Sequence, residues 1–213
     1  MSAAYGRDDF QRDTGVSRET LDRLQAYADL LAKWSKAVNL VGRSTLGEVW
    51  RRHMLDSAQL IEHLLPAPAG RPRRIADLGS GAGFPGLVLA VLGAGEVHLI
   101  ESDARKAAFL REAARVADAD VVLHVKRLES LPPLAADVVT ARALAPLDKL
   151  LGYAAPHLAS GGVALFLKGQ GVDGELTAAE KAWIMTVERL GSRSDPAATL
   201  LKVEAIERRN AKP

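Results

Sequence analysis

Two stretches in the first third of the chain carry apolar residues at helical spacing. In residues 17–34 and again in residues 45–65, an apolar side chain recurs every three or four positions, as in amphipathic helices. Thr45 and Glu48 also have the spacing of a capping box at the start of the second stretch. Two helices with opposed apolar faces predict an N-terminal helical cap over residues 17–66.

The pattern changes after residues 66–72, which read P-A-P-A-G-R-P and break helices by composition. Beyond them short apolar runs alternate with helical stretches, which predicts an α/β domain over residues 73–208 with a mostly parallel, doubly wound sheet. The last two apolar runs lack a long helix between them and are expected to pair as an antiparallel end. The predicted strands are 74–78, 96–101, 120–125, 137–141, 162–168, 185–190 and 200–206, and the predicted helices are 85–93, 104–117, 146–159 and 175–185.

The composition narrows the class of protein. With 213 residues, of which 48% are hydrophobic and 25% charged, the chain fits one main soluble domain plus an appendage. Residues 1–16 are polar and irregular, so a flexible arm is expected there, and neither a signal peptide nor a membrane span is expected. The chain has no cysteine and its five histidines are scattered, so we expect no metal site. A cytoplasmic monomer is the simplest expectation.

The formal charge is only +2, but basic residues gather in clusters at 51–53, 71–74, 126–127 and 208–212. Any one cluster is explained by a solvated surface. Several clusters close to one ligand site would instead favour a phosphate-rich partner such as RNA.

Residues 74–86 contain the richest motif, R-I-A-D-L-G-S-G-A-G-F-P-G. A strand here would lead into a loop with almost no side chains and then into a helix. In doubly wound sheets this first strand-to-helix turn is the usual ligand site, because glycines let backbone N–H groups approach a small polar molecule.

The sequence of the glycine loop is compatible with two different cofactors. Residues 81–86 satisfy the dinucleotide pattern G-x-G-x-x-G, and Glu101 follows about 20 residues later, which fits a nicotinamide cofactor. A P-loop is excluded, since Leu87 stands where its lysine would be. The glycine run begins earlier, however, at Gly79 after Asp77, and D-L-G-S-G-A-G resembles the D-x-G-x-G-x-G motif of class I S-adenosylmethionine-dependent methyltransferases.

That resemblance implies a Rossmann-like methyltransferase fold in which the loop, including Asp77, Gly79 and Gly81, approaches the methionine part of the cofactor. Glu101, at the end of the second strand, would then hold the ribose hydroxyls, for which a carboxylate is suited because it accepts two hydrogen bonds. Asp77 has an additional interpretation as a carboxylate that orders the loop.

The fourth strand ends in T-A-R-A at residues 140–143. Enzymes that methylate exocyclic amines resemble one another in placing an acid or amide plus Pro-Pro-aromatic at this point, and this chain does not. N7 of guanine has an in-plane lone pair and no proton to lose. A site without an obvious base is therefore compatible with methylation at N7, driven by alignment and desolvation.

Five short sequence motifs together resemble those of one protein family. They are N-L-V-G at 39–42, R-H-M-L-D-S at 52–57, D-L-G-S-G-A-G-F-P-G at 77–86, T-A-R-A-L-A-P-L at 140–147 and L-K-G at 167–169. Their order and spacing are similar to those of the bacterial 16S ribosomal RNA (guanine-N7)-methyltransferase G family, also called glucose-inhibited division protein B, over about residues 20–190. The resemblance implies S-adenosylmethionine as methyl donor and 16S ribosomal RNA, or a small-subunit particle, as partner.

The resemblance also implies site residues. Cofactor contacts would fall on Gly79, Phe84, Leu128, Glu129 and Arg142. Substrate contacts would fall on Asn39, His53, Asp56, Arg142 and Lys168. Plainer roles stay open: a core histidine for His53, an internal salt bridge for Arg142 and a surface lysine for Lys168. No catalytic base is expected, and Arg142 is the best candidate for positioning.

The C-terminal part departs from the family pattern, since its last strand opens without a basic residue. Arg189, Arg193 or Lys202 would have to compensate in RNA binding. The departure leaves a further alternative beside the nicotinamide-dependent oxidoreductase, namely an RNA-binding ribosome-assembly factor without catalysis.

Overall fold

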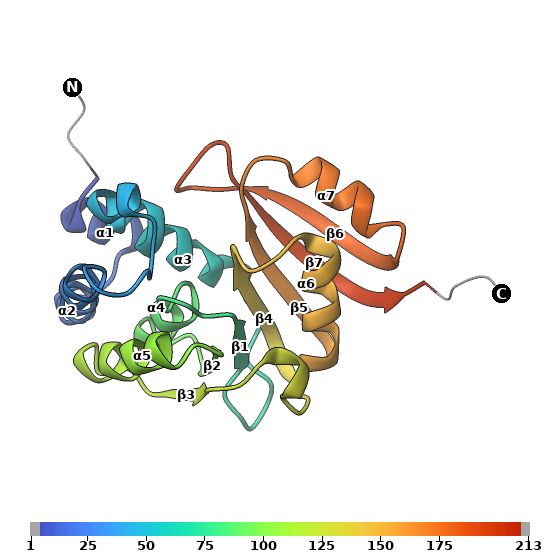
Figure 1. The fold of residues 1–213 in the computed structure, drawn as a ribbon, viewed down its shortest axis with the longest axis horizontal. Coiled ribbons are helices and arrows are strands. Elements are labelled where there is room, and N and C mark those ends of the chain that lie inside the picture. The colour runs from blue at the N-terminus through green and yellow to red at the C-terminus, as the bar shows by residue number, and fades with distance from the viewer. Residues whose placement is uncertain (1–4, 210–213) are drawn as a thin grey trace.

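The computed structural model describes residues 5–209, which are built around one sheet of seven strands in the order β3-β2-β1-β4-β5-β7-β6 (Figure 1). Strands β1 to β5 are parallel, and β7 lies antiparallel between β5 and β6. The predicted sheet, with its antiparallel end, is confirmed. The strands are β1 Arg74–Leu78, β2 Glu96–Ile100, β3 Val121–His124, β4 Ala136–Arg142, β5 Leu158–Lys168, β6 Trp183–Gly191 and β7 Thr199–Arg208.

Each face of the sheet carries its own core, because successive side chains of a strand point to opposite faces. Ile75 of β1 belongs to the core under α2 Arg18–Trp34, α4 Gly86–Val91 and α5 Ala104–Val116. Its neighbour Ala76 belongs to the core under α6 Leu147–Ala154 and α7 Val172–Ala179. Coverage on both faces explains why the central strands read as unbroken apolar runs. No helix within residues 5–209 has the length and hydrophobicity to cross a membrane.

The expectation of a flexible arm is wrong for Arg7–Thr14, which form helix α1. Phe10 is fully buried, and its ring lies 5.3 Å from that of Trp50. The Gly6 N–H donates to Asp9 Oδ2 at 2.8 Å, which stabilises the first turn. One apolar anchor in eight residues produces no periodicity, so the sequence pattern could not indicate this helix. The part of the predicted arm at residues 1–4 lies outside the described residues.

The second cap helix is irregular rather than a single α-helix. Its segments are the 3₁₀ turns η1 Arg43–Glu48 and η3 Gln59–His63, the π-helical turn η2 Trp50–Leu55 and the short helix α3 Asp56–Ala58. The predicted capping box is absent, since Thr45 Oγ1 donates to the Gly42 carbonyl instead. π-helical turns are frequent at functional sites, and this one carries His53.

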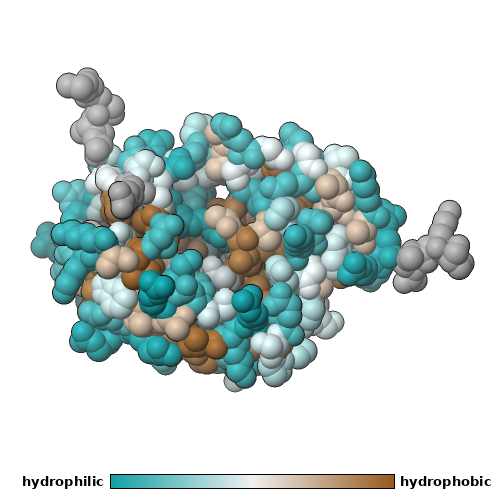
Figure 2. Space-filling view, in the orientation of Figure 1, coloured by the Kyte–Doolittle hydropathy of each residue, from teal (hydrophilic) through white to brown (hydrophobic). Residues whose placement is uncertain are grey.

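Figure 2 shows polar residues over most of one face, with apolar residues gathered toward the middle, between the N-terminal helices and the β6–β7 end of the sheet. The carboxyl ends of the parallel strands meet the helical cap in this region.

Candidate active site

Two adjoining cavities of about 620 and 370 Å³ open at the carboxyl ends of the parallel strands. Gly79, Gly81, Lys106 and Ala143 line both. The glycine loop therefore separates one cleft into two halves: a smaller half under the loops after β2 and β3, and a larger half under the N-terminal cap. Within residues 5–209 no cluster of three or more histidine or carboxylate side chains has a metal-binding arrangement.

The glycines of the loop serve two purposes. Gly79 has a φ of +66°, and a Cβ there would lie 2.5 Å from Leu144 Cδ1. Gly81 has a φ of +55°, and a Cβ there would make only an ordinary contact with the Gly79 carbonyl oxygen, at 3.7 Å. Gly86 is a packing residue, since a Cβ there would lie 2.5 Å from Leu99 Cδ2. The first two positions thus keep room for a ligand, and the last lets α4 approach the sheet.

Asp77 lies beneath the loop and lines neither cavity. It is fully buried, its Oδ1 accepts a hydrogen bond from Thr140 Oγ1 at 2.8 Å, and Ser80 Oγ donates to its main-chain carbonyl at 3.0 Å. Burial raises the pKa of its carboxyl to about 6 although Thr140 donates to it. Asp77 thus orders the loop from below, which is the other interpretation of its sequence position, and its direct cofactor contact stays a prediction.

Glu101 fits a ligand with two neighbouring hydroxyls. Its side chain is held by the backbone N–H of Gly81, which donates to Oε2 at 2.9 Å, and by that of Asp103, which donates to Oε1 at 2.7 Å. A carboxylate oxygen can accept more than one hydrogen bond, so each oxygen keeps capacity for a ribose hydroxyl. Glu101 is only 8% exposed yet lines the smaller cavity, so it is not an ordinary surface acid.

Leu128 and Glu129 line the same smaller cavity from the turn η4 Leu128–Ser130 after β3. Sequence reasoning missed several other lining residues there: Ser102, Lys106, Leu144 and Tyr153. A signal for Lys106 was present, because it stands in the first turn of the helix that directly follows Glu101 and so begins at the same edge of the sheet.

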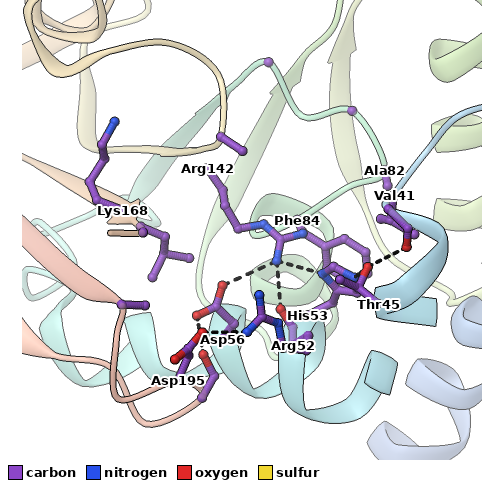
Figure 3. A pocket seen from close by; sticks show the side chains of 18 of the residues that line it. Val41, Thr45, Arg52, His53, Asp56, Ala82, Phe84, Arg142, Lys168 and Asp195 are labelled. Carbon is purple, nitrogen blue, oxygen red and sulfur yellow. Dashed lines mark hydrogen bonds and ion pairs between the residues drawn. The ribbon is translucent and has the colours of Figure 1, made fainter. Parts of the chain in front are cut away.

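Arg142 joins the end of β4 to the cap (Figure 3). Its Nη1 donates to His53 Nδ1 at 2.8 Å and to the Arg52 carbonyl at 3.0 Å, and lies 3.4 Å from Asp56 Oδ2. The guanidinium carbon lies 4.9 Å from the centroid of the Phe84 ring. Phe84 is 3% exposed and lines the larger cavity as an apolar wall. The structure thus brings together four residues that the sequence reasoning proposed separately.

His53 is a neutral, fully engaged ring. Its Nε2 lies 2.9 Å from Thr45 Oγ1, and since that hydroxyl donates to the Gly42 carbonyl, it accepts from His53 Nε2–H. Burial and the nearby cations of Arg142 and Arg52 lower the pKa of His53 to about 3. The ring also stacks on Phe84 at 4.9 Å. His53 therefore has no free nitrogen with which to accept a proton.

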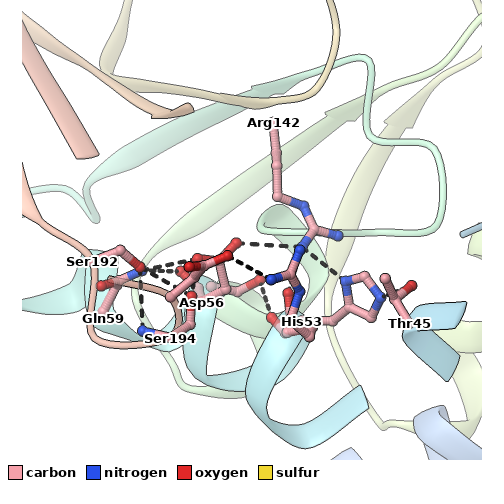
Figure 4. A network of polar contacts seen from close by, with 10 residues as sticks. Thr45, His53, Asp56, Gln59, Arg142, Ser192 and Ser194 are labelled. Atoms are coloured by element: carbon pink, nitrogen blue, oxygen red, sulfur yellow. Dashed lines mark hydrogen bonds and ion pairs between the residues drawn. The ribbon is translucent and has the colours of Figure 1, made fainter. Parts of the chain in front are cut away.

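Asp56 is the centre of a network that reaches the β6–β7 loop (Figure 4). Ser194 Oγ donates to Asp56 Oδ1 at 2.6 Å, and Gln59 Nε2 donates to the same oxygen at 3.1 Å. Nearby, Arg52 Nη1 pairs with Asp195 Oδ2 at 2.5 Å. Sequence reasoning missed Ser194 and Asp195, because nothing local relates them to a helix some 140 residues earlier.

Two predicted substrate residues are placed differently from expectation. Asn39 is exposed and lines neither cavity. Lys168 lines the larger cavity, but its side chain is only 9% exposed and its Nζ lies 2.5 Å from Glu175 Oε2. In Figure 3 this ammonium points away from the Arg142 guanidinium. Lys168 therefore ties β5 to α7, and neither a free phosphate ligand nor a surface lysine describes it.

The basic residues considered as compensation near the C-terminus also have internal partners. Arg189 pairs with Asp173 at 2.6 Å, Arg193 with Glu62 at 2.5 Å, and Lys202 with Glu204 at 3.4 Å. The first two pairs link β6 and the loop after it to α7 and η3, whereas the third lies within β7. Exposed pairs of this kind contribute little to stability.

The sheet order, the glycine loop and the strand-end carboxylate define a class I S-adenosylmethionine-dependent methyltransferase. Solved structures agree on this fold: ribosomal protein L11 methylase from Lactobacillus delbrueckii subsp. bulgaricus has a TM-score of 0.53 at 20% identity, covering 70% of this chain and 76% of that one. TYW2 of M. jannaschii, solved in complex with AdoMet, has a TM-score of 0.53 at 17% identity, covering 82% of this chain and 80% of that one.

The chain belongs to the rRNA small subunit methyltransferase G family, whose model matches residues 20–194. Ribosomal RNA small subunit methyltransferase G of Paramagnetospirillum magneticum is 56% identical over 98% of this chain and 100% of its own length. The protein of the same name from Rhodospirillum rubrum is 57% identical over 93% of this chain and 97% of its own length. The family resemblance seen in the sequence is confirmed, and the nicotinamide alternative is wrong.

Proposed function

We propose that this protein transfers a methyl group from S-adenosylmethionine to N7 of one guanine in the 16S ribosomal RNA of the small subunit. The observation that carries this proposal is the chemistry of the larger cavity. Its histidine is neutral with both nitrogens engaged. Each of its three carboxylates has a cationic partner: Asp56 faces Arg142, Asp195 pairs with Arg52, and Glu175 pairs with Lys168. Guanine N7 needs no proton acceptor, and this cavity offers no free one among the described residues that line it.

The residues of the smaller cavity suit the cofactor. When bound, S-adenosylmethionine supplies a methyl group activated by a positively charged sulfur. Glu101 would accept the ribose hydroxyls, and the backbone at Gly79 and Gly81 would admit the methionine part. Leu128 and Glu129 would border the base. The two cavities adjoin at the glycine loop, so a methyl donor held in the smaller one would face the larger one, which Phe84 and Arg142 line. The contribution of the chain is then alignment and exclusion of water.

RNA is the partner that the mouth of the cleft favours. Lys106, Lys126 and Arg127 line the smaller cavity and form one basic rim, and phosphate contacts of this kind position RNA without reading its sequence. We propose that the helical cap of residues 17–66 covers the acceptor nucleotide, and that the protein acts as a monomer in the cytoplasm, where ribosomal subunits are found.

The test is methyl transfer from labelled cofactor to small subunits, naked 16S RNA and assembly intermediates from cells that lack this protein. Chemical cleavage at N7-methylguanosine should map the label to a single guanine. Transfer to none of these RNAs would remove the proposed activity, and tight RNA binding without transfer would favour the assembly factor.

A further inference from the structure

Arg142 is anchored through one of its two terminal nitrogens. All of its hydrogen bonds to described residues use Nη1, which contacts His53, the Arg52 carbonyl and Asp56. Nη2 and Nε donate to no described residue, although both belong to a side chain that is only 17% exposed. Neither nitrogen is completely shielded from solvent, and Arg142 lines the larger cavity. Figure 4 shows the second terminal nitrogen turned away from the anchored one.

The contacts of Nη1 fix the orientation of the free edge of the guanidinium, which is the edge formed by Nη2 and Nε. The guanidinium plane is held over Phe84, and its rotation is limited by the acceptors on Nη1. Asp56 also carries a negative charge 3.4 Å from Nη1, which compensates the arginine charge inside the cavity. A compensated cation is important here because methylation at N7 leaves a positive charge on the base. The site therefore presents fixed N–H donors without a large net charge.

We propose that the free edge of Arg142 donates a hydrogen bond to O6 of the acceptor guanine and so selects guanine over adenine. This inference rests on the proposed function. On the edge that carries N7, guanine presents O6 as a second acceptor, whereas adenine presents the N6 amino group, a donor. An arginine donor matches the first and opposes the second. N7 itself stays free to receive the methyl group.

The test varies the acceptor base at the mapped position in reconstituted RNA. Hypoxanthine retains N7 and O6, whereas 2-aminopurine retains N7 and lacks O6. After correction for the intrinsic reactivity of each N7 toward dimethyl sulfate, the unaltered protein should methylate hypoxanthine within about threefold of guanine. It should methylate 2-aminopurine and adenine with kcat/KM about 10–100-fold lower, as the loss of one specifying base contact implies.

The variant Arg142→Gln, tested on the same bases, completes a double-mutant cycle between the arginine and O6. It should lower kcat/KM for both bases because it also frees His53 and Asp56, but it should lower the value for guanine more, so that the preference for O6 falls to about threefold or less. Arg7→Gln, which breaks an ion pair with Asp22 between α1 and α2, is the matched control and should retain the full preference. Calorimetry with S-adenosylmethionine separates this effect from weaker cofactor binding.

Equal corrected rates on guanine and 2-aminopurine with the unaltered protein would overturn the inference, and this arm needs no variant that folds. An unchanged preference in Arg142→Gln would overturn it as well. Absence of methylation on guanine itself would instead contradict the proposed function.

Discussion

The two halves of the cleft differ in how the chain builds them. The cofactor half is formed by consecutive strand-to-helix turns, and its main contact, Gly81 N–H to Glu101, joins residues 20 positions apart. The acceptor half is assembled from distant segments: Arg142 reaches His53 across 89 positions, and Ser194 reaches Asp56 across 138. A local motif therefore specifies the first half, whereas only the folded chain creates the second. Changes in the first should act on cofactor affinity, and changes in the second on methyl transfer.

The largest effect is expected from Gly79→Val. A Cβ at this position would lie 2.5 Å from Leu144 Cδ1, and the φ of +66° is unfavourable for a β-branched residue. Repacking of Leu144 toward the cavity would occupy cofactor space, so calorimetry should show affinity for S-adenosylmethionine reduced by about 1,000-fold, or about 4 kcal/mol.

Gly161→Val is the control for this prediction. Gly161 has a φ of +74° with nothing near its Cβ position, and it lies outside both cavities. It should lose stability from the backbone conformation alone and keep cofactor affinity. Equal affinity losses in the two variants would attribute the effect to strain rather than to the cofactor half.

The second prediction contrasts buried titratable groups from the two halves. Burial raises the pKa of Asp77 from 3.8 to about 6, so its ionisation makes folding less favourable as pH rises from about 4 to 6. The shift corresponds to about 3 kcal/mol. Asp77→Asn should therefore gain stability relative to the unaltered protein between pH 4 and 7, measured by urea denaturation at each pH.

Ionisation of His53 should change the free energy of unfolding with pH in the opposite direction. Its pKa is lowered from 6.5 to about 3, so folding becomes less favourable as pH falls below about 6.5. His53→Gln should gain stability relative to the unaltered protein as pH is lowered. If both variants shift in the same direction with pH, the assignment of charge states in the two halves is wrong.

The sequence predicted the cofactor half of the cleft better than the acceptor half. Periodicity and strand-end spacing predicted the sheet, its antiparallel end and Glu101, because each depends on short segments. Asp77 was placed at the right strand end, but its direction was not predictable, since only packing under the loop turns it away from the cavity. Lys168 shows the limit in the acceptor half: its partner Glu175 lies on α7, and no sequence pattern indicates that pair.

A third prediction concerns the charge beside Arg142. Asp56→Asn retains an oxygen that can accept from Ser194 and Gln59, but it removes the negative charge 3.4 Å from Arg142 Nη1. The uncompensated cation would oppose the positive charge that develops on the base, so kcat should fall about 10–100-fold. Affinity for S-adenosylmethionine should change less than threefold. A large loss of cofactor affinity with unchanged single-turnover rate would contradict the separation of the halves.

The smallest effect is expected from Ser194→Ala, which removes a hydrogen bond to Asp56 Oδ1 but leaves the one from Gln59. A hydrogen bond to a charged carboxylate contributes about 1.5–3 kcal/mol. Because Gln59 still holds the same oxygen, looser positioning of Asp56 should lower kcat by only about threefold to tenfold. Ser194→Thr keeps the hydroxyl and should restore the rate.

Ser17→Ala is the matched control. It deletes the cap on the Thr20 N–H of α2 and costs about 1 kcal/mol of stability, yet Ser17 lies outside both cavities. If Ser17→Ala lowers kcat as much as Ser194→Ala, then stability and not Asp56 links the β6–β7 loop to methyl transfer. If only Ser194→Ala lowers it, a loop 138 residues from Asp56 in sequence belongs to the acceptor half.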